Sequence, residues 1–134
     1  MKKSRSKIRI GKVQEAFNKA IVRRDKMCVV MNEERCSGSL QCSHFFPVGG
    51  NSCLRFYPLN AFAQCAGHHL AHHNRDPLFY AKFMDLYFPD ELHWMEINRG
   101  RVVRYTQAVL AEILEACNAD NLDKVREIVR GLFE

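Results

Sequence analysis

Two pairs of cysteine and histidine residues constrain this chain more than any other feature of its sequence. The first pair is Cys28-x7-Cys36, and the second is Cys65-x2-His68. Structural zinc takes four tetrahedral thiolate or imidazole ligands, usually delivered as two closely spaced pairs. The segment between the pairs buries little apolar surface, and bound zinc can contribute on the order of 10 kcal/mol to folding. The spacing therefore predicts a zinc-stabilised fold built around these four residues.

The remaining cysteines leave a second arrangement open. Cys42 can compete as a zinc ligand, although it lies two residues before His44 on an expected strand. Cys53 and Cys117 fit better as small buried hydrophobic side chains. The opposing interpretation is that all the cysteines are unconnected core residues. Two ligand pairs that flank an expected hairpin favour zinc over that interpretation.

The bulk composition is that of one ordinary globular domain. Hydrophobic residues make up 47% of the 134 positions, which is typical of such a domain. No stretch approaches the roughly 20 apolar residues of a membrane span, and the N-terminus lacks the apolar core of a secretory signal. We therefore expect a single soluble domain over residues 1–134, cytoplasmic and without membrane contact, in a compartment where disulfides are rare.

The excess positive charge lies in one segment. Six cations and no acid occur within residues 1–12, whereas the other 122 residues hold 14 basic and 15 acidic side chains. A basic arm over residues 1–11 can neutralise phosphates and release counterions from a nucleic acid. The alternative interpretation, a solubilising flexible tail, stays open on charge alone.

Apolar periodicity predicts how the domain is organised. Apolar residues at 13, 16, 17, 20 and 21 share one face of a helix over 12–25. Short apolar runs over 27–59 predict a hairpin with one strand at 40–46 and an extended piece at 54–56. A helix from Cys65 follows, and the finger as a whole is expected over 26–88.

The chain after residue 76 is predicted to be mostly helical. Helices are expected after an Asp76 N-cap, over 90–97, after a Thr106 cap, and over 122–130 with Gly131 as terminator. The fold class is therefore α+β: a small zinc-stabilised finger with an N-terminal helix and a helical extension over 89–134 packed around it.

A second set of histidines follows the spacing of a phosphodiesterase site. His69 and His73 are four residues apart, so on a helix they share one face and can chelate a divalent ion. His44 ends the expected strand, where it can act as a general base that activates water. Asn60 can hold the intervening loop by side-chain to backbone hydrogen bonds and so orient His44. We expect the three imidazoles to point toward one common site.

The histidine-rich helix contains a second pair with the same spacing. His68 and His72 are also four residues apart, on a face rotated by about 100°. The register of His68 with Cys65 assigns His68 to the zinc. His72 then has no assigned role, and we expect it to be exposed or to contact a phosphate.

Residues 28–83 resemble the HNH endonuclease motif, the ββα-metal or His-Me finger. The family places a histidine before an asparagine that is followed by x8-His-x3-His, and Asn60-x8-His69-x3-His73 has this form. The resemblance implies His44 as general base, Asn60 as orienting residue, and His69 and His73 as ligands of a catalytic Mg²⁺, Mn²⁺ or other divalent ion. Ser43 departs from the family, which often has a metal-binding Asp or His at this position.

The short segments Ser43-His44-Phe45 and Leu54-Arg55-Phe56 resemble segments of the phage NinG/Rap recombination nucleases. This resemblance implies a phage or prophage protein that acts in a bacterial host on branched or nonspecific DNA. The DNA backbone contacts are expected from four basic residues: Arg55, Arg23, Arg24 and Lys26. The rival hypothesis is a non-catalytic zinc module that binds nucleic acid or protein.

The C-terminal helices allow two packing arrangements. Their apolar residues either cover the finger or form a homodimer interface; the residues concerned are Val125, Ile128, Val129 and Leu132. Packing within the chain is the commoner outcome for such a stripe.

Overall fold

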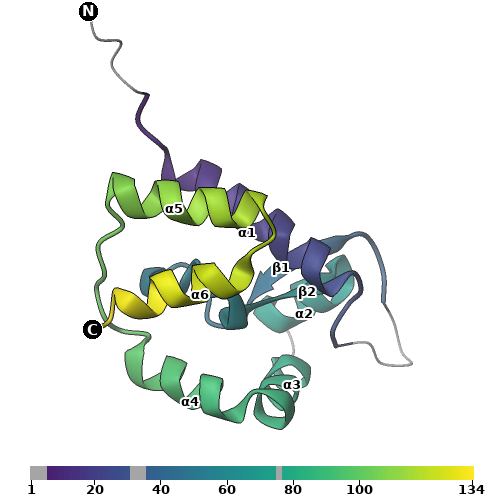
Figure 1. Cartoon of the computed structure of the whole chain (residues 1–134). Coiled ribbons are helices and arrows are strands. Elements are labelled where there is room, and N and C mark those ends of the chain that lie inside the picture. The colour runs from purple at the N-terminus through teal and green to yellow at the C-terminus, as the bar shows by residue number, and fades with distance from the viewer. Residues whose placement is uncertain (1–5, 31–35, 75–76) are drawn as a thin grey trace, which may run out of the picture.

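The computed structural model describes residues 6–30, 36–74 and 77–134, with the side chains of residues 73 and 74 left aside. Figure 1 shows helices arranged around one small sheet. In chain order the elements are α1 (Ile10–Asp25), β1 (Leu40–His44), η1 (Ser52–Leu54), η2 (Pro58–Asn60), β2 (Ala61–Cys65), α2 (Ala66–Asn74), α3 (Leu78–Tyr87), α4 (Pro89–Asn98), α5 (Gln107–Asn118) and α6 (Leu122–Gly131). The predicted α+β class is confirmed.

The sheet consists of β1 and β2, which pair antiparallel with Leu40 opposite Cys65 and His44 opposite Ala61. Both β1 and β2 contact α1, and α2 packs against both strands as well. In Figure 1, α1 and α5 run side by side, with α6 beneath them and α3 and α4 at the far end. The sheet therefore lies between α1, at the start of the chain, and α2, which follows directly from β2.

The second strand is the main correction to the expected fold. The extended piece predicted at 54–56 is instead part of a tight turn, because the backbone N–H groups of Leu54 and Arg55 donate back to Asn51 and Ser52. The partner of β1 is Ala61–Cys65, all five residues of which are buried. Helices cover both faces of β2, so its residues show none of the alternation that marks a half-buried strand.

The predicted helices are confirmed with small shifts of their ends. Thr106 caps α5, because its Oγ1 accepts a hydrogen bond from the N–H of Val109 at 3.2 Å. Gly131, expected as a terminator, is instead the last residue of α6. The N-cap expected at Asp76 lies outside the described residues. No helix in the ranges described is long and apolar enough to cross a membrane.

The C-terminal helix packs on the rest of the chain. Val125 and Val129 are fully buried in the core that also contains Phe17 and Ile21 of α1. Most of the apolar stripe of α6 therefore packs within the chain, as in the arrangement where the C-terminal helices cover the finger.

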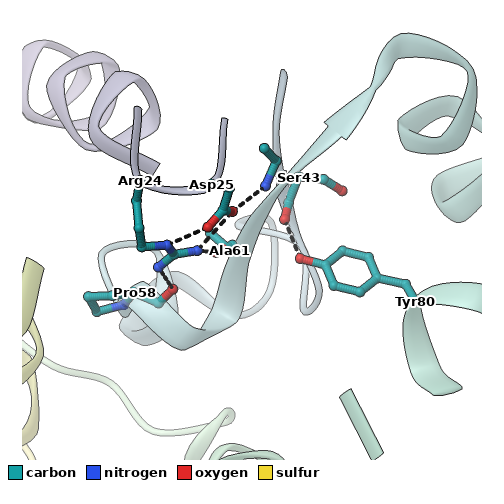
Figure 2. A network of polar contacts seen from close by, with 7 residues as sticks. Arg24, Asp25, Ser43, Pro58, Ala61 and Tyr80 are labelled. Atoms are coloured by element: carbon teal, nitrogen blue, oxygen red, sulfur yellow. Dashed lines mark hydrogen bonds and ion pairs between the residues drawn. The ribbon is translucent and has the colours of Figure 1, made fainter. Parts of the chain in front are cut away.

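A charge cluster fixes the end of α1 to the sheet (Figure 2). Arg24 pairs with its neighbour Asp25 through Nε at 2.7 Å and Nη2 at 3.0 Å. The same guanidinium donates to the carbonyl oxygens of Pro58 at 2.9 Å and Ala61 at 2.8 Å. On the other side of the sheet, the Tyr80 hydroxyl donates to the carbonyl oxygen of Ser43 at 2.6 Å. These contacts hold both ends of the hairpin loop in place.

Candidate metal centre and histidine site

Four ligand atoms gather where α1, β2 and α2 meet. Cys28 follows the end of α1, Cys65 ends β2, and His68 lies in the first turn of α2. Together with Cys36, their Sγ and nitrogen atoms all lie within 4.8 Å of one another. The grouping predicted from the spacing of the two pairs is confirmed, and Cys42 lies outside it.

The interatomic distances suit a tetrahedral ion. His68 Nδ1 lies 3.3 Å from Cys28 Sγ, 3.9 Å from Cys36 Sγ and 3.2 Å from Cys65 Sγ. Bonds of about 2.3 Å to sulfur and about 2.1 Å to nitrogen place such atoms about 3.6 Å apart. Three thiols and one imidazole can therefore hold a structural metal ion such as zinc.

Backbone donors surround the Cys65 sulfur. The N–H groups of Ser37 and His68 both approach Cys65 Sγ at 3.4 Å. Burial opposes ionisation of this thiol, but the two backbone donors and the Cys28 and Cys36 thiols together outweigh it and lower the pKa of Cys65 below its ordinary value. At Cys28 burial dominates and raises the pKa of the thiol to about 11. Cys65 is therefore the ligand best prepared to bind as a thiolate.

Two glycines allow the Cys36 turn to approach α2 closely. Gly38 has a φ of +79°, and a Cβ there would lie 2.7 Å from Cβ of Ala66. A Cβ on Gly67 would lie 2.4 Å from Oγ of Ser37. The N–H of Gly67 also donates to the carbonyl oxygen of Ser37 at 3.0 Å. This role of Gly67 was not predicted from the sequence, although a glycine between two metal ligands is a usable signal.

His44, the expected general base, lies at the end of β1 with its ring against α1. Its imidazole stacks on Phe17 at a centroid distance of 5.8 Å and an interplanar angle of 28°. His44 Nε2 lies 3.0 Å from the carbonyl oxygen of Arg55. Because a carbonyl oxygen only accepts, Nε2 must carry the hydrogen, and Nδ1 is then the basic nitrogen of the neutral ring.

Asn60 holds the loop between the two strands at both ends. Its Oδ1 accepts from the N–H of Phe46 at 2.9 Å, and its Nδ2 donates to the carbonyl oxygens of Phe46 at 3.1 Å and Leu54 at 3.3 Å. The side chain is fully buried. The side-chain amide of Asn60 therefore fixes the loop that carries Arg55. The orienting role expected for Asn60 requires such a restraint.

Arg55 is half-buried and has no acidic partner among the described residues. Its Nε donates to Oε1 of Gln14 at 2.8 Å. Burial lowers the pKa of Arg55 below its ordinary value because no nearby carboxylate offsets the loss of water. The guanidinium still stays protonated, and it is held by Gln14, whose amide nitrogen lies 3.5 Å from His44 Nε2.

Among the described side chains, His69 of α2 lies on the other face of the hairpin from the ring of His44. His69 Nδ1 lies 2.8 Å from Oε1 of Gln41, and Gln41 and His44 point to opposite faces of β1. The expected convergence of the three imidazoles on one face is therefore not observed for His44 and His69. The side chain of His73 is outside the described part of the chain. Ser43 is fully buried, and its Oγ has no hydrogen-bond partner among the described residues.

His72 is packed rather than exposed, contrary to expectation. Its ring stacks on Phe45 at 5.7 Å and meets Tyr80 edge-on at 4.7 Å. Its Nε2 lies 3.2 Å from the carbonyl oxygen of Phe45. Because an imidazole has both an apolar face and polar edges, it can join α2 to α3 and to the residue that follows β1 at once.

Two of the residues expected to contact DNA have structural partners. Arg24 uses Nε and both terminal nitrogens inside the fold, as described above. Arg23 donates to Asp120 at 2.7 Å and to the carbonyl oxygen of Cys117 at 3.2 Å, which joins α1 to the turn after α5. Lys26 is exposed at the end of α1 with a φ of 64°. Arg55 and Lys26 are thus the better placed of the four for a phosphate.

Comparisons with protein-family models, with curated proteins and with solved structures find no match to this chain.

Proposed function

We propose that this chain is a metal-dependent DNA endonuclease of the HNH type, with a zinc ion held by Cys28, Cys36, Cys65 and His68. The observation that carries the proposal is the pairing of His44 with Arg55. His44 Nε2 lies 3.0 Å from the backbone carbonyl oxygen of Arg55, whose half-buried side chain has no acidic partner in the described ranges. A buried cation is costly without a counter-ion, and a phosphodiester supplies one.

The reaction that we propose is hydrolysis of a phosphodiester bond. His44 takes a proton from water as the water oxygen bonds to phosphorus, while the bond from phosphorus to the 3′ oxygen breaks. Arg55 holds a non-bridging oxygen and offsets the charge that develops on it. A divalent ion such as Mg²⁺ or Mn²⁺, bound by His69 and His73, would stabilise the leaving oxygen. The products are a 5′-phosphate and a 3′-hydroxyl.

The two faces of the hairpin define where the substrate lies. His44 at the end of β1 faces α1, whereas His69 contacts Gln41 on the opposite face of β1. Gln41 lies three residues before His44 on β1, so the proposal requires DNA and its metal ion to reach from one face of the strand to the other. The basic arm and Lys26 would follow the DNA backbone. Branched or nonspecific DNA, in phage or prophage recombination, is the substrate class that the NinG/Rap resemblance suggests.

A plasmid-nicking assay with Mg²⁺ or Mn²⁺ tests the proposal. We expect wild type to nick and His44→Ala to lose about 10²- to 10⁴-fold in rate with the zinc content unchanged. His93→Ala is the matched control, because His93 is an exposed histidine on α4, remote in sequence from the motif. Equal and negligible cutting by all three proteins would contradict the proposal.

The rival is a zinc module that binds nucleic acid or protein without cutting. Ser43 favours it, because a buried hydroxyl stands where an HNH enzyme often has a metal ligand. The rival predicts that His44→Ala binds DNA as wild type does and that neither protein cuts it.

A further inference from the structure

Gln14 of α1 connects the two residues on which the proposed chemistry depends. It lies outside the segment that resembles the HNH motif. We propose that Gln14 is a positioning residue that sets the orientation of His44 and the placement of the Arg55 guanidinium. This inference rests on the proposed function, and its test separates the two.

The Gln14 amide binds both the side chain and the backbone of Arg55. Its Oε1 accepts from Arg55 Nε at 2.8 Å, and its Nε2 donates to the carbonyl oxygen of Arg55 at 3.2 Å. Arg55 Nε can only donate, so it fixes which end of the amide is oxygen. One neutral side chain thus determines the position of the guanidinium and of the carbonyl that His44 uses.

Gln14 also approaches the imidazole itself. Its Nε2 lies 3.5 Å from Nε2 of His44. The amide nitrogen donates its two hydrogens elsewhere, one to the carbonyl oxygen of Arg55 and the other to Oδ1 of Asn18 at 3.0 Å. Two donors, Gln14 Nε2 and His44 Nε2, therefore share the Arg55 carbonyl oxygen. This arrangement excludes the tautomer with its hydrogen on Nδ1, because that ring would present a lone pair to the carbonyl.

The neutrality of Gln14 has its own consequence. A carboxylate at this position could also accept from Arg55 Nε, but it would pair with the guanidinium and neutralise the charge needed for a phosphate. It would also stand near His44 Nε2 and raise the pKa of that imidazole. Gln14 provides the hydrogen bonds while leaving the Arg55 charge available.

Two substitutions test these roles. Gln14→Leu keeps a similar size and removes every hydrogen bond, so we expect kcat on duplex DNA to fall about 10- to 100-fold. Gln14→Glu should raise KM for DNA and move the acid limb of the pH–rate profile up by about one unit. The control is Glu15→Gln, because Glu15 is exposed on the same helix and pairs only with Lys19 among the described residues. It should leave kcat, KM and the profile unchanged.

Nitrogen chemical shifts of the His44 ring give a readout that does not depend on cleavage. The His44 signals are assigned by their loss in His44→Gln. We expect the Nε2–H tautomer in wild type and a mixture of tautomers in Gln14→Leu, with unchanged zinc content and melting temperature.

The outcomes separate the two proposals. Suppose that wild type cuts DNA. If Gln14→Leu then keeps kcat within twofold of wild type, and its His44 ring nitrogens have the same chemical shifts as in wild type, Gln14 has no positioning role. If no protein cuts DNA while the tautomer still depends on Gln14, the positioning stands and the endonuclease proposal fails. If Gln14→Leu does not fold, unchanged ring shifts and an unchanged pH profile in Gln14→Glu overturn the inference.

Discussion

Asp25 Oδ2 accepts a hydrogen bond from the backbone N–H of Ala63 at 2.8 Å, which joins the end of α1 to the middle of β2. The same carboxylate pairs with Arg24, which in turn holds the carbonyl oxygens of Pro58 and Ala61. Ala61 is the strand partner of His44. The position of the histidine thus depends on an ion pair that belongs to a helix outside the finger.

We expect Asp25→Asn to lower the free energy of unfolding by about 2 to 4 kcal/mol, measured by urea denaturation. The substitution leaves the guanidinium of Arg24 partly buried without its counter-charge, which costs more than the lost hydrogen bond. The control is Glu15→Gln, whose exposed pair with Lys19 should cost less than about 0.5 kcal/mol. Equal effects of the two substitutions would show that the Asp25 cluster is not structural.

The four-ligand centre predicts one zinc ion per chain. Cys65→Ser should remove that ion and cause loss of the hairpin structure, because the ligand with two backbone donors is gone. Elemental analysis of the purified protein, with circular dichroism, checks both effects. Cys42→Ser is the matched control, since Cys42 lies on β1 outside the cluster. Full zinc content in Cys65→Ser would contradict the assignment.

The turn after Cys36 gives a test of close packing. Gly38→Ala should destabilise the protein by about 1 to 3 kcal/mol, because it places a side chain at positive φ and against Ala66 at 2.7 Å. Gly49→Ala is the comparison, because a Cβ there meets nothing among the described residues within 4 Å. Thermal unfolding with and without a chelator measures both. If Gly38→Ala leaves the stability unchanged, the turn does not depend on the close approach of Gly38 to Ala66.

Glu91 predicts a pH dependence of stability. Burial opposes its ionisation, but hydrogen bonds from Tyr57, Arg126 and Arg130 outweigh burial and hold the pKa of the carboxyl below its ordinary value. A depressed pKa in the folded state adds stability above the unfolded pKa of about 4.3. That stability is lost as the pH falls through the folded value.

We expect Glu91→Gln to lower the free energy of unfolding by about 2 kcal/mol at pH 7. The difference from wild type should shrink as the pH falls below about 4. Denaturant titrations of both proteins from pH 3 to pH 7 measure it. A difference that stays constant over this range would show that the carboxylate charge is not what stabilises the cluster of α4 and α6.

Local patterns in the sequence predicted the helices and the metal ligands. The apolar spacing of α1, the Thr106 cap and the two Cys/His pairs each depend on neighbours within a few residues. They were confirmed because helical periodicity, capping and ligand spacing are local properties.

The sequence alone determined which four residues could meet around a metal ion and that helices would surround a hairpin. Only the tertiary structure decided that Ala61–Cys65 is the second strand, that His72 is packed on Phe45, and that Arg24 faces inward. It also decided that Gln14 meets Arg55 and His44. These features depend on which distant surfaces cover a residue, and burial by remote segments outweighs the local preference of the residues themselves.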